Sequence, residues 1–345
     1  MTNVAVKEGD IAKHNTIIHH FLDLERQAGF KVKDHHYKTL DSIISQAERE
    51  ISPPKRNTKE EAVRTLKAIY SLIEKRGFAY AKGITLTSDR LKNKMLNCHG
   101  YVTLNLAIAE VLDLPLTGVL LPKHIIARWH LDDKHYFNWE TVIGNEGADD
   151  LTYFLERKIH TKAIKNELFL KSLNKDQHLA IQYVSQGRAW MDQKQPIKAY
   201  QNFTAAIEQD KNYACAYANR GALLIKNEDS KGAKDLAKAL RIDPHNFTAL
   251  FYTGVAASRE GRTEEAVKNY LVLLKIDPRN EKALTNLGCI YVDNDKFRMA
   301  VACFSKAIEI NPTCAKTYHN RSIAYHALGE KEKAIDDACM VFELS

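Results

Sequence analysis

A cysteine, a histidine and an asparagine follow one another in this chain in the order of a nucleophile site. Cys98 is the only cysteine in the first 214 residues, and it stands where an apolar helix is expected to begin. Backbone amides at a helix start stabilise a thiolate. His124 can take the thiol proton, and Asn138 can hold the other nitrogen of that imidazole. Together these side chains would suffice to attack the carbonyl of an amide, an ester or a thioester.

Neighbouring residues offer alternatives for some of these roles. Glu140 lies two residues beyond Asn138, on the same side of an expected strand, and could orient the imidazole instead. Negative charge that develops on a substrate would meet the Cys98 amide and a donor before it, such as Asn97. His99 is a weaker candidate for the base, because a neighbour at the same helix start tends to point away. A lone cysteine there can also be a packing residue, so a structural interpretation stays open.

Both helices and strands are expected to position these residues. Periodicity and breaks predict an α+β domain over residues 1–175. A turn at 132–134 would join the last two strands in a hairpin and so bring His124 and Asn138 close. The expected helices are 14–28, 35–51, 59–77, 98–113 and 149–175, and the expected strands are 117–121, 124–131 and 135–141.

The second half of the chain repeats with a period of 33 or 34 residues. Small residues at fixed positions let two short helices approach closely, and bulky residues fill the seam between them. The period resembles the tetratricopeptide repeat and predicts an all-α solenoid over 180–345. About five units are expected, at 180–213, 214–246, 247–280, 281–314 and 315–345. The small positions are Gly187, Gly221, Gly254, Gly288 and Ser322, then Ala199, Gly232, Ala266, Ala300 and Ala334, and the bulky ones are Phe203, Leu236, Tyr270 and Phe304, with Ala338 in the last unit.

The segment from Asn97 to Gly144 resembles the transglutaminase-like branch of the papain-type cysteine superfamily. It is most similar to bacterial proteins that join such a domain to tetratricopeptide repeats. The resemblance implies the nucleophile at Cys98, the base at His124 and the orienting residue at Asn138, on a core of one buried helix against an antiparallel sheet. It implies no substrate, since the superfamily includes peptidases, amidases, deamidases, acyl-transferring enzymes and inactive members. Besides Gly144, the matching motifs are Asn97-Cys98-His99-Gly100, Leu112-Asp113-Leu114-Pro115, Val119-Leu120-Leu121-Pro122-Lys123-His124 and Phe137-Asn138-Trp139-Glu140-Thr141.

The repeat array is expected to bind a protein or a peptide in its concave groove. The last helix stays apolar up to Leu344, so it could mediate a homodimer instead of only packing on the helix before it. Side chains that match polar concave positions are Asn219, Arg220, Asn320 and Arg321. The remaining cysteines are expected to be small packing residues: Cys215, Cys289, Cys303, Cys314 and Cys339.

The composition of the chain limits the class of protein to which it can belong. The 345 residues are 45% hydrophobic and 27% charged, which is typical of a globular protein with two domains. The net charge of +7 is not concentrated in one tract, so nucleic-acid binding is not indicated. No apolar run reaches the roughly 18 residues of a membrane helix, and no secretory signal is recognisable. We therefore expect a cytoplasmic protein, although export without a cleaved signal would look the same. No metal or other cofactor is expected.

Two main hypotheses follow from these patterns. The first is a cysteine-dependent amide hydrolase or acyltransferase whose repeats choose the protein substrate. The second is an adaptor with an inactive head, which binds peptides through its repeats. A third, weaker hypothesis is a repeat protein that acts on a nucleic-acid-linked partner through its mild basic charge.

Overall fold

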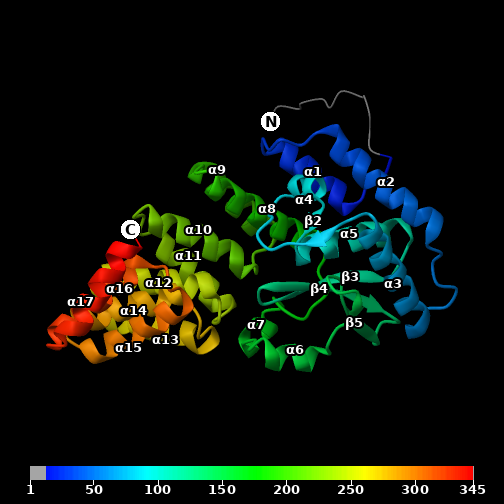
Figure 1. Ribbon diagram of the computed structural model, residues 1–345. Helices are drawn as coiled ribbons and strands as arrows, with labels where there is room; N and C mark the ends of the chain where they lie inside the picture. The colour runs from blue at the N-terminus through cyan, green and yellow to red at the C-terminus, as the bar shows by residue number, and fades with distance from the viewer. Residues whose placement is uncertain (1–12, 345) are drawn as a thin grey trace. The chain divides into compact units, whose positions relative to one another are not determined.

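The computed structural model describes residues 13–344 (Figure 1). Contacts divide the chain into two compact units, one ending at Ala216 and the other beginning at Tyr217. The first unit mixes helices and strands, and the described part of the second is a helical array. The helices of the first predicted repeat fall in the first unit, so the domain boundaries of the sequence analysis stay a prediction. Among residues 13–344, no helix is both long and apolar enough to cross a membrane.

The first unit opens with amphipathic helices whose apolar stripes are buried. Thr58 begins the third of them, because its side chain accepts a hydrogen bond from the Glu61 amide. The segment 84–97, which shows no clear period, contains a further short helix and the second strand of a short parallel pair. The elements are α1 (Ile17–Gln27), α2 (Asp34–Glu50), α3 (Lys59–Lys75), β1 (Ala79–Tyr80), α4 (Thr87–Asn93) and β2 (Met95–Leu96).

A buried helix against an antiparallel sheet forms the centre of this unit. α5 runs from Cys98 to Val111, and Val102, Leu104 and Ile108 within it are fully buried. The strand order of the sheet is β3-β4-β5-β6, and each neighbouring pair is antiparallel. Figure 1 shows α5 beside this sheet. The strands are β3 (Leu116–Leu121), β4 (His124–His130), β5 (Tyr136–Glu140) and β6 (Asn145–Glu146).

The register of β4 and β5 decides which side chains can meet across the hairpin. Asn138 lies opposite Arg128. His124 precedes Arg128 by four residues on β4, which is roughly 13 Å along the strand. The hairpin therefore does not bring His124 and Asn138 close, contrary to the prediction. Glu140 points to the same face as Asn138 and lies two residues nearer to the His124 end.

Two short helices follow the sheet, whereas the sequence predicts one helix over 149–175. Lys158 and Glu167, which follow the two helices, have left-handed backbone conformations, so the helical pattern is interrupted twice. In Figure 1 these helices and α5 lie at opposite sides of the sheet. The elements that complete the unit are α6 (Asp150–Glu156), α7 (Thr161–Lys165), α8 (Lys175–Asp192) and α9 (Pro196–Gln209).

The second unit stacks helices in pairs, each with a small residue facing a bulky one. A Cβ built on Gly288 would lie 2.5 Å from the Phe304 ring, and one built on Gly254 would lie 2.8 Å from the Tyr270 ring. Glycine is required at both positions because the ring occupies the space of a side chain. The helices are α10 (Ala214–Lys226), α11 (Gly232–Ile242), α12 (Phe247–Arg259), α13 (Thr263–Ile276), α14 (Glu281–Asp293), α15 (Phe297–Ile310), α16 (Ala315–Ala327) and α17 (Lys331–Glu343).

Candidate active site

Cys98 is the first residue of α5, where Asn97 fixes the start of the helix. The Asn97 side chain accepts a hydrogen bond from the Gly100 amide at 2.8 Å and donates one to the Ile84 carbonyl, also at 2.8 Å. Its amide group is therefore used to cap the helix. One of its two side-chain donors is thus engaged, and the oxyanion role of Asn97 stays a prediction. The backbone amide of Cys98 lies in the first turn, where helix amides lack intrahelical acceptors, and stays the candidate donor.

His124 stands between Cys98 and a carboxylate. Its Nε2 lies 2.8 Å from Glu140 Oε2, which leaves Nδ1 to face the thiol. A hydrogen bond between the Cys98 thiol and the His124 imidazole joins the start of α5 to the start of β4. The side chains of His124 and Glu140 are 15% and 17% exposed, so the pair is partly shielded from water. A thiol, an imidazole and a carboxylate are thus aligned in the order that a cysteine nucleophile needs.

Both ionisations are shifted toward a thiolate and an imidazolium. Burial raises the pKa of the Cys98 thiol, but the hydrogen bond and the positive charge of His124 outweigh it, so the net shift is downward. Burial also opposes charge on His124, yet its hydrogen bonds to Cys98 and Glu140 raise its pKa to about 9. Because the two groups are coupled, their protons come off as a pair. The thiolate is the nucleophilic form of cysteine, and this arrangement favours it.

Glu140 is held in turn by a tyrosine of α6. Tyr153 Oη donates a hydrogen bond to Glu140 Oε1 at 2.5 Å, which leaves Oε2 for His124. Burial raises the pKa of Glu140, but its hydrogen bonds with His124 and Tyr153 outweigh that effect and lower it. Gly147 makes room for this contact, since a Cβ there would lie 2.6 Å from Tyr153 Oη. Sequence reasoning missed Tyr153, because only the docking of α6 places it beside β5.

Asn138 has a different role from the predicted one. Its Oδ1 accepts a hydrogen bond from Arg128 Nε at 2.9 Å. Its Nδ2 donates to the Ala148 carbonyl at 2.8 Å and to Asp150 Oδ1 at 3.0 Å. Arg128 also pairs with Asp150 at 2.5 Å, and Arg128 and Asn138 are both buried. The prediction that Asn138 orients the imidazole is therefore wrong in this structure, and Glu140, the alternative, occupies that position.

His99 faces the core rather than the thiol. It is 5% exposed, and its ring lies 5.8 Å from that of Phe21. Burial, together with the charges of Arg90 and His178, lowers the pKa of His99 well below its usual value. A neutral imidazole enclosed in the core is poorly placed to take the Cys98 proton, so His124 stays the candidate base.

The contact between Tyr153 and Glu140 can be tested through Gly147. We expect Gly147→Ala to displace the phenol and to lower the free energy of unfolding by about 1–3 kcal/mol, because a hydrogen-bonded and partly buried pair is broken. Tyr153→Phe is the matched variant without the hydroxyl. In the double variant the new Cβ no longer meets the hydroxyl, so the two losses should not add. Chemical denaturation of all three variants measures this, and strictly additive losses would contradict the contact.

Two arginines predicted to contact a partner are engaged within their repeats. Arg220 donates to both carboxylate oxygens of Asp235, at 2.7 and 2.9 Å. Arg321 does the same with Asp337, at 2.7 Å for both. Each bidentate pair joins the two helices of one repeat, α10 with α11 and α16 with α17. These arginines therefore have a structural role that the sequence analysis did not predict.

The other predicted partner residues and the cysteines vary in their surroundings. Asn320 donates a hydrogen bond to Cys289 Sγ at 3.3 Å, so it contacts the preceding unit, and Asn219 stays a predicted partner residue. Cys289 and Cys303 pack against the apolar cluster of the array, and burial raises the pKa of Cys303 to about 11. Cys339 is exposed, which corrects the expectation that it is a packing residue.

Comparisons with known proteins assign part of the array. Tetratricopeptide-repeat family models match residues 219–281 and residues 281–314. The C-terminal half of this chain contains tetratricopeptide repeats. Both matches lie within 219–314, so they assign no family to the mixed helical and sheet region that precedes the repeats. A search of curated proteins finds no match to the chain.

Several solved structures share a distant likeness with this chain. A structure titled as the functional characterisation of Pseudomonas aeruginosa pilF is 19% identical, covers 50% of this chain and 79% of its own, and has a TM-score of 0.47. MamA from Desulfovibrio magneticus is 17% identical over 48% of this chain and 94% of its own, with a TM-score of 0.43. YrrB, described as a TPR protein with an unusual peptide-binding site, is 20% identical over 54% of this chain and 91% of its own, with a TM-score of 0.41. Likenesses this distant carry no argument about function.

Proposed function

We propose that this protein binds a protein or peptide partner through its tetratricopeptide repeats. The observation that carries this proposal is the family match over residues 219–314. Stacked repeats of this kind present an extended concave surface, and their stability does not depend on filling it, so the surface is free to bind a ligand. Asn219 and Asn320 stay candidate contacts on that surface, and Asn320 also donates a hydrogen bond to Cys289 of the preceding repeat.

A peptide selection with a structural readout tests the proposed binding. Peptides selected from a random library against the full chain are expected to bind with saturation and to slow amide hydrogen exchange within residues 219–314. The matched control is a scrambled version of each selected peptide. Peptides that protect only residues before 217, or no residues at all, would contradict the proposal.

The alignment of Cys98, His124 and Glu140 favours a second function, cysteine-dependent chemistry at a carbonyl group. In this proposal Cys98 Sγ bonds to the carbonyl carbon of an amide, an ester or a thioester, and the bond to the leaving group breaks. His124 gives the leaving group its proton, and the acyl group remains on Cys98 as a thioester. Water or an amine then attacks that thioester, loses its proton to His124 and releases the acyl product, which frees Cys98. The transglutaminase-like resemblance supports this reading, with the repeats selecting the protein that carries the substrate.

Acyl transfer from an activated ester tests this second function. With p-nitrophenyl acetate, we expect a burst of p-nitrophenol and an acetyl group on the peptide that contains Cys98, as found by mass spectrometry. His124→Ala should reduce the burst rate by a factor of about 10²–10⁴, because the general base is lost. Cys339→Ser, which removes an exposed thiol of the array, is the control and should leave the burst intact. Acetylation that is equal with and without His124 would instead favour the adaptor with an inactive head.

A further inference from the structure

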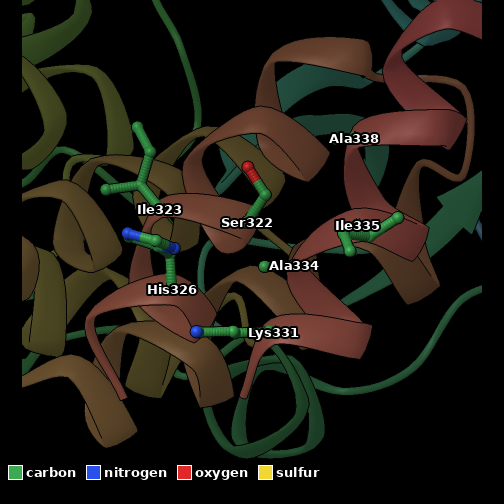
Figure 2. Close-up of a pocket in the computed structure, with 7 residues that line it drawn as sticks. All are labelled: Ser322, Ile323, His326, Lys331, Ala334, Ile335 and Ala338. Carbon is green, nitrogen blue, oxygen red and sulfur yellow. The ribbon is translucent and has the colours of Figure 1, made fainter. Parts of the chain in front are cut away.

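A groove of about 500 Å³ lies between α16 and α17, the two helices of the last repeat (Figure 2). Its walls are mainly apolar, from Ile323, Ala334, Ile335 and Ala338. Ile323 and Ile335 are 44% and 62% exposed, so the walls are open to solvent. We call this groove the α16/α17 socket.

The socket lies between the paired helices, at the position where other repeats bury a bulky side chain of their own. Two repeats each bury an aromatic ring against a glycine in the seam between their paired helices, namely Phe304 and Tyr270. In the last repeat, Ala338 stands at the position of the ring and Ser322 at the position of the glycine. The loss of a ring from a close-packed seam leaves its neighbours without contacts on one side. The exposed fractions also indicate an open seam in the last repeat, because Ala300 is fully buried whereas its counterpart Ala334 is only partly buried.

The chemistry of the missing side chain indicates what the socket can accept. A phenyl or phenol ring fills the same seam elsewhere in the array, and an aromatic ring supplied by another protein would restore those contacts. Figure 2 shows His326 and Lys331 beside the apolar walls, and Lys331 brings a positive charge to the rim. The Ser322 hydroxyl donates to the His319 carbonyl at 2.7 Å, so it brings no unpaired donor into the socket.

We propose that the α16/α17 socket binds a segment of a partner protein that presents a Phe or Tyr side chain next to an acidic residue. The ring would enter between Ser322 and Ala338, and the carboxylate would meet Lys331 at the rim. This inference rests on the proposed partner binding and names the chemistry that one part of the array recognises. Affinity for such a segment comes mainly from removing the ring from water, and the charge adds selectivity.

The repeat pattern itself supplies a variant that closes the socket. Ser322→Gly with Ala338→Phe restores the glycine and ring pair that Gly288 and Phe304 form in the preceding unit. This double variant should fold at least as well as the natural chain, because it refills a seam rather than opening one. Ser322→Gly alone leaves the socket open and is the matched control.

Binding of a labelled peptide measures the effect in the full chain. The probe is fluorescein-labelled Gly-Asp-Phe-Asp-Gly, followed by fluorescence polarisation up to about 1 mM protein. We expect saturable binding, at least tenfold weaker binding when Ala replaces Phe in the probe, and weaker binding when Asn replaces both Asp. The double variant should bind the probe at least tenfold more weakly, whereas Ser322→Gly should stay within about twofold of the natural chain.

Several results would overturn the proposal. These are no saturable binding, equal binding of the Ala probe, or equal binding by the double variant while thermal unfolding shows that it is folded. Phe342 of α17 is 85% exposed and is a ring that a second copy of the chain could insert. Self-association that both the double variant and Phe342→Ala abolish, without probe binding, would identify a second copy as the occupant. The two proposals fail separately: selected peptides that protect residues 219–314, together with a labelled probe that does not bind, would remove only the socket proposal.

Discussion

At pH 7 and limiting iodoacetamide, Cys98 is expected to react before the other five thiols. The reason is the imidazole of His124, whose hydrogen bond and positive charge lower the pKa of Cys98 despite its burial. The thiolate fraction changes about tenfold per pKa unit below the midpoint. Burial acts without such a partner at Cys303, where it raises the pKa to about 11, so that thiol should react last. Mass spectrometry of the labelled peptides ranks all six.

His124→Ala should reverse this order. With the imidazole removed, burial dominates and the pKa of Cys98 rises above its ordinary value. Labelling of Cys98 at pH 7 should then slow by about 10–100-fold. The rate of the natural protein should rise with pH through a midpoint below that of a free thiol, and the midpoint of the variant should lie above it. Labelling that is unchanged by His124→Ala would rule out the thiol and imidazole pair as a functional site.

Asn138→Leu is expected to cost stability without altering the thiol. Asn138 accepts from the buried Arg128 guanidinium, so its loss leaves a buried charge short of one acceptor. We expect the free energy of unfolding to fall by about 2–4 kcal/mol in urea titrations. The labelling midpoint of Cys98 should not move, because Asn138 has no hydrogen bond to His124 among the described contacts. A shift in that midpoint would support the role that the sequence analysis assigned to Asn138.

Glu140→Gln is the contrasting variant, because it keeps the shape of the side chain and removes its charge. The hydrogen bond and charge of Glu140 help to raise the pKa of His124 to about 9 against the effect of burial. A group whose pKa is raised on folding stabilises the fold fully below its unfolded value, about 6.5, and this contribution disappears as the pH rises through the folded value. The contribution of His124 should therefore decrease between about pH 6.5 and 9, and it is measured in a Cys98→Ser background, because the lowered pKa of the Cys98 thiol acts in the opposite direction. This slope should flatten in Glu140→Gln, and the labelling midpoint of Cys98 should rise.

Several features of the site could be read from the chain alone. Asn97 before the apolar run of α5 marks a helix start, and a helix start is defined by residues adjacent in sequence. The turn at 132–134 also fixes the register of the two strands that it joins. Leu131 and His135 flank it and are hydrogen-bonded at 2.8 Å. Counting outward from that pair in equal steps places Asn138 opposite Arg128, too far along the strand for an imidazole at position 124.

The elements that were missed are those with weak local signals. β1 and β2 have two residues each, and α4 has seven, so none is long enough to show a hydrophobic period. Their positions depend on contacts from distant segments. Glu25 of α1, for example, accepts hydrogen bonds from the Thr87 and Ser88 amides at the start of α4. Such a cap cannot be recognised from the neighbouring sequence, because the capping residue lies far away in the chain.

The sequence by itself determined the repeats, the helix that begins at Cys98 and the hairpin that carries His124. Each depends on spacing along the chain, which periodicity and turn residues report directly. The tertiary structure decided which polar side chain meets that histidine. Asn138 and Glu140 share one face of β5, and α6 separates their roles by placing Asp150 beside Asn138 and Tyr153 beside Glu140. Both side chains could accept a hydrogen bond from an imidazole, so hydrogen bonds from a distant segment decide which of the two contacts His124.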